Sequence, residues 1–330
     1  MCLASIDRFR GDFVWRFLLS TLIIMSCSFS GPSQAVADER LIAVIMANSQ
    51  PRYNQVHAAF VKNTGGFCDT DCRIYVQTPN ADTMSLRNSV RKAVALGAEL
   101  IVTYGPLATL AAKAELPPVP IIFADVYDPV GLKIVSASTK TGRNMSGIRG
   151  DAPVQGLFKY FTDTVTVRKF AILFDMHSPE ALLQKRILEE SSKRKGITVY
   201  AMEVGEAHNY FAQLGKLPDD VDGVFIASSE QHESQLSFVL GYTNARKIPV
   251  ITQLAGAADE GAFMVLETSA QEQGEKLAEI AGQVFSGQNI NQLPMLNPHS
   301  IAFVINLSVA KELSIKVPIQ TLSVASRVVR

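Results

Sequence analysis

The sequence predicts an α/β protein with two doubly wound lobes, each a parallel sheet covered by helices on both faces. Short apolar runs rich in β-branched residues alternate with amphipathic segments, as expected of strands that are buried on both faces. The alternation starts near residue 41 and restarts at residue 169. The chain that follows the N-terminal segment, about 290 residues, is larger than one ordinary hydrophobic core, which favours two domains.

The first series of elements ends at a proline-rich break and a final short strand. Its strands are expected at 41–46, 73–77, 100–103 and 120–123. Its helices are expected at 54–62, 83–96 and 105–114. Thr83 can cap the second helix and Gly97 ends it. The glycine-bearing stretch 142–150 has no phosphate-loop spacing and predicts a turn followed by a crossing strand.

The second series repeats the pattern to the end of the chain. Its strands are expected at 169–174, 197–203, 223–227, 248–252, 261–266 and 301–305. Its helices are expected at 178–195, 207–214, 231–246, 270–285 and 307–313. Ser178-Pro179-Glu180 is a strong helix start, because it offers a cap, a proline at the first helical position and an acid in the first turn.

The N-terminal segment has the three parts of a secretory signal peptide. Arginines precede an apolar run at 17–29, and Ala35-Val36-Ala37 provides a small-x-small cleavage site. The run is shorter than the ~20 apolar residues that span a membrane. We expect residues 1–37 to be removed after Ala37. An uncleaved anchor and lipidation at Cys27 stay open as alternatives, although Met25 is bulky for a lipobox.

Charge and cysteine content narrow the classes of partner. Lys plus Arg and Asp plus Glu are both 31, so the formal net charge is zero, which argues against nucleic acid or an anionic membrane surface as the main partner.

After the signal, two cysteines remain, Cys68 and Cys72. In an oxidising compartment we expect them to form a small disulfide loop. A metal site with Asp69 and Asp71, or free thiols, are the alternatives.

Polar and aromatic side chains follow the ends of the predicted strands. In parallel sheets the ligand site lies beyond the carboxyl ends of the strands, so these loops predict a pocket for a small polar ligand. The competing interpretation is that Ser, Asn, Asp and Gly serve only turns and caps. The loops are 48–54, 104–109, 124–129, 175–178, 228–231 and 253–259.

Catalytic and cofactor motifs are missing from the sequence. Neither the phosphate-binding motif GxxxxGK[ST] nor a dinucleotide-type GxGxxG after a strand occurs, and neither HExxH nor GxSxG is present. The five histidines are scattered, and only His177 falls at a strand end. We therefore expect no cofactor, no bound metal and no enzymatic activity.

Two blocks of sequence resemble a known family. Residues 120–131, PIIFADVYDPVG, followed by GRNMSG at 142–147, are similar to the apolar strand, DPVG turn and GGNVTG segment of the substrate-binding proteins of ABC transporters, in the branch with tryptophan- and tyrosine-binding members. Here Arg143 replaces the second glycine. The tail 303–318 parallels the closing strand and helix of that family.

The resemblance implies a type I periplasmic-binding fold with three hinge crossings. By analogy the crossings fall near Ile148-Arg149, Gln253-Leu254 and Leu293-Pro294. The first lobe is then 38–148 plus 255–292, and the second lobe is 149–254 plus 293–330, including the C-terminal tail.

The resemblance also implies a set of ligand-binding residues at matching positions. We expect Tyr53 and Tyr104 to flank an aromatic or apolar side chain of the ligand, while Glu230 neutralises an amine. The complete set is Gln50, Pro51, Tyr53, Asn54, Tyr104, Gly105, Pro106, Asp125, Asp128, Ser178, Glu180, Ser228, Ser229, Glu230 and Gln253.

The function that follows is that of a monomeric receptor in the periplasm. It would bind a small polar ligand, such as an aromatic amino acid, between its lobes and deliver it to an ABC permease in the inner membrane. A sensory binding protein, which presents its ligand state to a membrane kinase or chemoreceptor, would have the same fold and is the alternative. An exported enzyme is a third, unsupported class.

Overall fold

The computed structural model describes residues 39–48, 50–68, 72–136, 144–204 and 210–330. The fold below is that of the unit Arg40–Arg330. The predicted signal peptide lies outside the described residues. In the part of the chain that is described, no helix combines the length and the apolar character that crossing a membrane requires.

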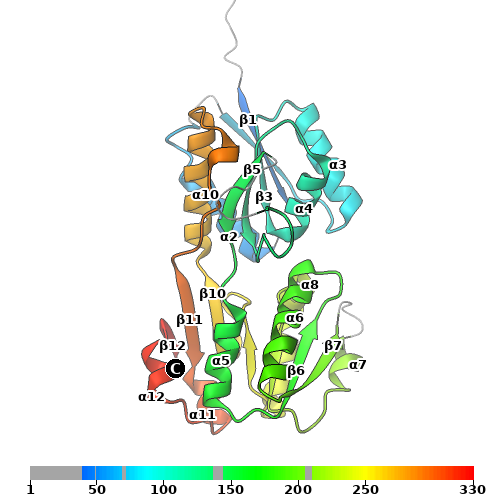
Figure 1. Cartoon of the computed structure of the whole chain (residues 1–330), viewed down its shortest axis with the longest axis vertical. Coiled ribbons are helices and arrows are strands. Elements are labelled where there is room, and N and C mark those ends of the chain that lie inside the picture. The colour runs from blue at the N-terminus through cyan, green and yellow to red at the C-terminus, as the bar shows by residue number, and fades with distance from the viewer. Residues whose placement is uncertain (1–38, 49, 69–71, 137–143, 205–209) are drawn as a thin grey trace, which may run out of the picture. The chain divides into compact units, whose positions relative to one another are not determined.

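The first lobe is a five-stranded parallel sheet in the order β2-β1-β3-β4-β5 (Figure 1). Its strands are β1 (Arg40–Met46), β2 (Cys72–Gln77), β3 (Leu100–Tyr104), β4 (Ile121–Val126) and β5 (Met145–Arg149). Its helices are α2 (Pro51–Lys62), α3 (Thr83–Ala95), α4 (Gly105–Glu115), α10 (Ala270–Phe285) and the 3-10 helix η2 (Ile290–Gln292).

Alternation along β1 explains why both faces of this sheet are covered. Side chains of neighbouring strand residues point to opposite faces. Ala43 and Ile45 belong to the core with α3 and α4. Ile42 and Val44 belong to the core with α2 and α10. Because the side chains on both faces are fully buried, the sequence of β1 is a continuous apolar run. This run is the pattern from which the strand was predicted.

The second lobe is a seven-stranded sheet in the order β12-β11-β10-β9-β8-β6-β7. Its strands are β6 (Lys169–Phe174), β7 (Thr198–Glu203), β8 (Gly223–Ile226), β9 (Val250–Thr252), β10 (Met264–Thr268), β11 (Ile301–Asn306) and β12 (Arg327–Val329). Its helices are α5 (Val154–Thr164), α6 (Pro179–Arg194), α7 (Tyr210–Leu214), α8 (Glu230–Ala245), α9 (Ala257–Glu260), α11 (Leu307–Glu312) and α12 (Ile319–Ser323).

The two faces of this sheet are also separately packed. Phe170 and Ile172 of β6 lie in the core with α5 and α6, whereas Ala171 and Leu173 lie in the core with α7 and α8. One strand departs from the expected parallel arrangement, because β11 pairs antiparallel to β10. The chain leaves the second lobe at the carboxyl end of β10 and returns beside that same end, so β11 must run in the opposite direction.

Three crossings join the lobes, and all three lie further along the chain than expected, the second by the widest margin. The first is at 150–153, between β5 and α5. The second is at Ser269, since β10 pairs with β9 in the second sheet while α10 packs on α2 and β4. The expected assignment of 255–268 to the first lobe is therefore corrected. The third is at 297–300, because Leu296 still bridges to Ile148 of β5.

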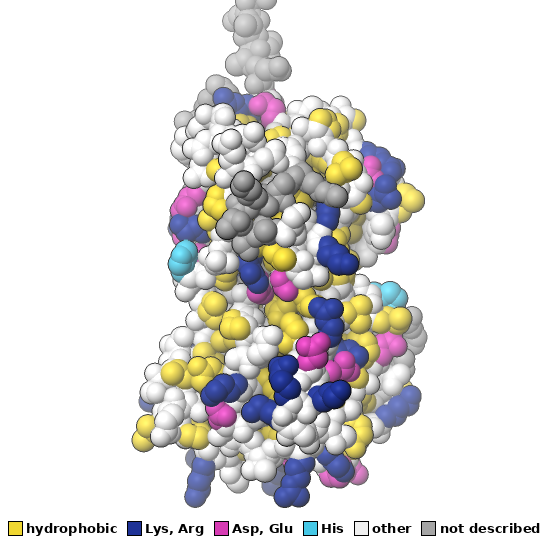
Figure 2. All heavy atoms as spheres, in the orientation of Figure 1, with side chains coloured by type: hydrophobic (Ala, Val, Ile, Leu, Met, Phe, Trp, Pro, Cys, Tyr) yellow, Lys and Arg dark blue, Asp and Glu magenta, His cyan; other side chains and the backbone are white. Residues whose placement is uncertain are grey.

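Surface charge and the cysteine pair complete the description. Lys and Arg side chains lie among Asp and Glu side chains on the face drawn in Figure 2. A disulfide joins Cys68 to Cys72 at the start of β2. This end of the strand is opposite to the carboxyl end, at which ligands of such sheets bind.

Candidate ligand site between the lobes

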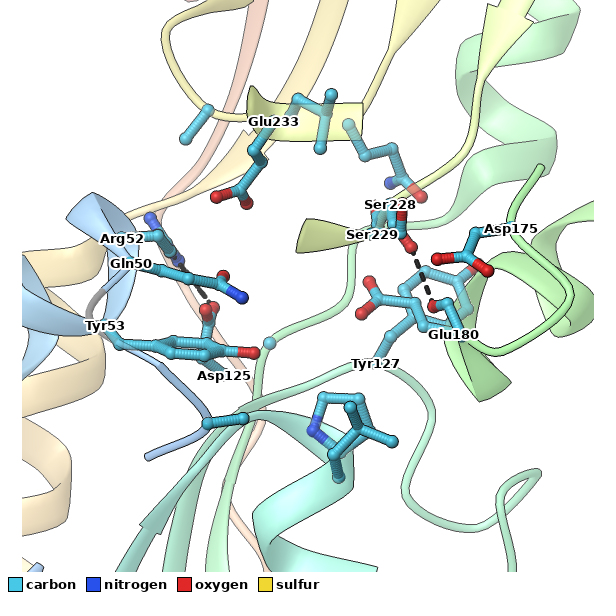
Figure 3. Close-up of a pocket in the computed structure, with 18 of the residues that line it drawn as sticks. Gln50, Arg52, Tyr53, Asp125, Tyr127, Asp175, Glu180, Ser228, Ser229 and Glu233 are labelled. Carbon is cyan, nitrogen blue, oxygen red and sulfur yellow. Dashed lines mark hydrogen bonds and ion pairs between the residues drawn. The ribbon is translucent and has the colours of Figure 1, made fainter. Parts of the chain in front are cut away.

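A cavity of about 320 Å³ lies between the carboxyl ends of the strands of both lobes. Its walls are the loops after β1, β3 and β4 on one side and those after β6, β8 and β9 on the other, with the end of β10 also lining it. In Figure 3, Arg52, Tyr53 and Asp125 lie across the cavity from Asp175, Glu180 and Ser228. Gly150 and Ala152 of the first crossing also line it.

Arg52 ties the first-lobe wall to the crossings. Its Nε and Nη2 donate to Asp125 Oδ1 at 3.1 and 2.9 Å. Its Nη1 donates to the Thr268 carbonyl at 2.8 Å, and Nη2 donates to Thr268 Oγ1 at 2.9 Å. Thr268 Oγ1 in turn donates to the Gly150 carbonyl at 3.1 Å. One guanidinium thus connects α2 with the ends of β4 and β10, and Thr268 extends the connection to the first crossing.

Asp125 reaches Arg52 because the backbone departs from regular strand geometry there. The register of β4 and β5 shifts between Phe123 and Val126, and Asp125 has a φ of +55°. Gln273 of α10 accepts from the Asp125 N–H at 3.0 Å and fixes the turn. Gly150 permits it, because an added Cβ would lie 2.7 Å from the Asp125 backbone. The irregularity therefore places a carboxylate in the cavity wall.

Tyr53 and Tyr127 contribute the aromatic surface. Tyr53 projects from the first turn of α2 and lies against Gly105, where an added Cβ would be 2.0 Å from the Tyr53 hydroxyl oxygen. Gly105 also has a φ of +77°, so two independent constraints favour glycine at this position. Tyr127 is 5 % exposed and lines the cavity beside Glu180 (Figure 3).

The second-lobe wall is held by a buried glutamine. Gln184 of α6 is fully buried. Its Oε1 accepts from the Ser228 N–H at 2.7 Å, and its Nε2 donates to Ser228 Oγ at 2.9 Å and Gln253 Oε1 at 3.1 Å. Gln253 donates to the Ala152 carbonyl at 2.9 Å. The loops after β8 and β9 are thereby fixed to each other and to the first crossing.

Carboxylates dominate the electrostatics of the cavity. Glu180 is in the first turn of α6, where the helix dipole favours an acid. Burial, together with repulsion by Asp125, nevertheless raises its pKa well above the ordinary range of a carboxyl. Ser178 caps the same helix by accepting from the Ala181 N–H at 3.1 Å, and its hydroxyl donates to the Ser228 carbonyl at 3.0 Å. Asp175, Glu233 and Glu267 complete the acidic lining.

The structure brings nine of the residues expected from the sequence to the cavity. They are Gln50, Tyr53, Pro106, Asp125, Ser178, Glu180, Ser228, Ser229 and Gln253. Glu230 begins α8, but its side chain lies outside the described part of the structure.

The remaining expected residues lie elsewhere. Tyr104 does not flank the cavity, because it is fully buried and its hydroxyl lies 3.2 Å from His57 Nδ1. Gly105 lies beneath Tyr53, Pro51 and Asn54 are exposed on α2, and Asp128 faces a different hollow beside Arg149. The sequence reasoning missed Arg52, Tyr127, Asp175, Glu233 and Thr268. Of these, Arg52, Tyr127 and Asp175 were in loops singled out for their polar composition, whereas Glu233 and Thr268 were not.

Two α/β lobes linked by three crossings, with a polar cavity at facing strand ends, define a two-lobed receptor for a small ligand. The chain belongs to the family of ABC transporter substrate-binding proteins, whose sequence model matches residues 62–329. No group of three His, Cys, Asp or Glu side chains that could hold a metal ion occurs among the described residues.

Individual relatives and solved structures are similar to this chain over most of its length. The chain is 21% identical over 282 residues to a tyrosine-binding protein of Clostridioides difficile strain R20291, covering 84% of this chain and 82% of the relative. It shares the fold of an ABC domain from Streptococcus pneumonia solved with L-Trp. The TM-score is 0.81 and the identity 19%, and the match covers 88% of this chain and 100% of that domain. A third match is the ligand-free, open structure of a substrate-binding protein with adhesive properties from Clostridium difficile. The TM-score is 0.68 and the identity 19%, and the match covers 88% of this chain and 99% of that protein.

Proposed function

We propose that this protein is an exported receptor that binds a small amine-bearing solute between its lobes and delivers it to an ABC permease. The observation that carries the proposal is the cavity itself, which is lined by strand ends of both lobes and by Gly150 and Ala152 of the first crossing. A ligand shifts an open state to a closed state only through its greater affinity for the closed one, so contacts from both lobes are required.

Named residues have distinct roles in this proposal. Gln50 and Tyr53 contact the ligand from the first lobe, and Glu180 and Ser228 contact it from the second. Arg52 and Gln184 do not contact the ligand themselves; they hold these two walls in position. The relatives that bind tyrosine and L-Trp support a ligand with an amine and an apolar or aromatic body.

A thermal-shift screen tests the binding function. The exported protein, purified from the cells that make it, is mixed with amino acids, amines, peptides, sugars and oxyanions. Since a ligand that binds only the native state stabilises it by mass action, about 2.7 kcal/mol at 100 times Kd, a true ligand gives a clear rise in melting temperature. If no compound raises it, or if a bound compound is converted to product, the receptor proposal fails.

Processing and partner are tested separately. We propose cleavage after Ala37, so the intact mass of the exported protein should correspond to a chain that begins at Asp38. A mass that retains acylated Cys27 would favour a lipid anchor instead.

For the partner, deletion of the gene should abolish uptake of the radiolabelled ligand. Unchanged uptake, with loss of a transcriptional or chemotactic response, would favour the sensory alternative. We expect a monomer in solution, which light scattering checks.

A further inference from the structure

Tyr127 belongs to the first lobe by its place in the chain but packs inside the second lobe. It directly follows β4, which is a strand of the first sheet. Its side chain is 5 % exposed and lies in the core of the second lobe together with Leu157, Phe158 and Leu183. Among the described buried residues of that core, it is the one that the first lobe contributes. A single side chain therefore extends from one lobe into the interior of the other.

The backbone that carries Tyr127 is held at the first crossing. Val126, the last residue of β4, pairs with Arg149 of β5, and the Gly150 N–H donates to the Val126 carbonyl at 2.9 Å. When two lobes rotate about a hinge, the displacement of a residue grows with its distance from that hinge. Tyr127 is next to the crossing, so its side chain can stay inside the second lobe while the lobes open and close.

The Tyr127 hydroxyl also has a partner in the second lobe. Val154 is the first residue of α5, and the N–H groups of a first helical turn have no partner within the helix. The Val154 N–H interacts with the Tyr127 hydroxyl and partly offsets the rise in the pKa of the phenol, which burial and the nearby Asp151 carboxylate cause. The residue is thus held at both ends, by its backbone at the crossing and by its hydroxyl at the start of α5.

Tyr127 separates the ligand cavity from a second hollow. In Figure 3 its ring lies at the cavity wall beside Glu180. The hollow has a volume of about 370 Å³ and is lined by the first and third crossings and by the start of α5. Among the described residues that line either space, Tyr127 is the one that lines both. A ligand that fills the cavity therefore reaches the side chain that joins the lobes at their hinge.

The loop that continues from Tyr127 adds further contacts between the lobes. Leu132 packs against the cores of both lobes. An added Cβ at Gly131 would lie 3.2 Å from Leu183 Cδ2, so the loop closely approaches α6. Helix α4 also packs on α6. The lobes therefore touch along the side of the cleft formed by α4 and α6, and Tyr127 is the contact that lies next to the crossing.

We propose that Tyr127 is the pivot of lobe closure and couples occupation of the cavity to the angle between the lobes. The inference rests on the receptor function proposed above and names a positioning residue for it. The ring keeps the lobes aligned while they rotate, and a ligand packed against its cavity side holds them at the closed angle. Without the ring, the population of the closed, binding-competent state should fall. If it falls by about 10-fold, the apparent affinity weakens by the same factor.

Distances between spin labels on the two lobes test the pivot without a ligand. The labels are attached at Met84→Cys on α3 and Glu190→Cys on α6, two exposed positions that do not line the cavity, and pulsed electron paramagnetic resonance measures their separation. Tyr127→Leu should broaden the distance distribution of the ligand-free protein. Tyr160→Leu is the matched control, because Tyr160 packs against the same core but comes from α5 within the second lobe. It should lower stability and leave the distances unchanged.

Affinity for the ligand found by the thermal-shift screen gives a second readout. Tyr127→Leu should weaken binding by about 10-fold, whereas Tyr160→Leu should not. Tyr127→Phe keeps the ring and should retain the wild-type distances. If Tyr127→Leu does not fold, Tyr127→Met takes its place. Unchanged distances in the variant without a ring, an equal change in Tyr160→Leu, or altered distances in Tyr127→Phe would each overturn the pivot. A failed screen would refute the receptor function and leave the distance measurement untouched.

Discussion

Arg52 and Thr268 connect the two lobes at the point where the chain crosses between them. The guanidinium of Arg52, in the first turn of α2, donates to both the carbonyl and the hydroxyl of Thr268, the last residue of β10. The two residues are 216 positions apart in the sequence. The wall that carries Gln50 and Tyr53 is thereby anchored to the end of β10, directly before the crossing at Ser269.

Replacing Arg52 should therefore destabilise the protein strongly. The side chains of Arg52 and Asp125 are only 12% and 13% exposed, so Arg52→Met leaves a largely buried carboxylate without its cation. Loss of one partner of such a pair is expected to cost about 3 kcal/mol of unfolding free energy. Urea denaturation of the ligand-free protein measures it. Arg327→Met, which breaks an exposed pair with Asp259, is the control and should cost about 0–1 kcal/mol. Equal losses would show that the Arg52 network has no special role.

The sequence was sufficient for the order of most elements and for the loops that line the cavity. Continuous apolar runs identified the buried strands, and the ends of those runs indicated which loops meet. Helix α5 was missed, although Val154, Leu157, Phe158 and Phe161 have helical spacing and are buried. The position of β10 was assigned to the wrong lobe by analogy, because a crossing inside a run of strands and helices leaves no local signal in composition.

Individual side chains of the site were harder to predict than its location. Tyr104 ends β3 and was expected in the cavity, but its side chain points into the core against His57. Arg52 looks like a solvated residue at the start of a helix. Its partners Asp125 and Thr268 are 73 and 216 positions away, and no local pattern connects them. Such long-range polar networks become visible only in three dimensions.

Gly105→Ala should displace Tyr53 and so weaken ligand binding. The substitution combines a left-handed backbone with a Cβ that collides with the Tyr53 ring. The matched control is Gly97→Ala, which has a similar φ of +79° and open space around the Cβ. Strain alone should cost the control about 1–2 kcal/mol of stability and leave its affinity unchanged. Calorimetry and denaturation of both variants separate strain from collision. Equal affinities would contradict a ligand-binding role for Tyr53.

Gln184→Met should loosen the second-lobe wall. The change removes the acceptor of the Ser228 N–H and the donor to Gln253 while keeping a similar volume. An unsatisfied buried amide is expected to cost about 1–3 kcal/mol of stability. Ligand affinity should fall as well, because the loops after β8 and β9 lose their common anchor. Gln271→Met, at an exposed position of α10, is the control. A Gln184 variant with normal affinity and normal stability would mean that the loops are fixed by other contacts.

His232 should make the stability of the protein depend on pH between about 6.5 and 4. It is fully buried in α8, where its Nδ1 donates to the Ala227 carbonyl, and no described residue hydrogen-bonds to Nε2. Burial lowers its pKa to about 4.

The sign of the effect follows from which state binds the proton. Above pH 6.5 both the folded and the unfolded state hold a neutral imidazole. As the pH falls towards 4, the unfolded state takes up a proton and the folded state does not, so the unfolding free energy falls, by about 3 kcal/mol at most. His232→Gln should flatten this slope in urea denaturation at pH 7 and pH 4.5, whereas His177→Gln, whose side chain is 73% exposed, should retain it. If the His232 variant lost as much stability on acidification as the wild type, other groups would carry the transition.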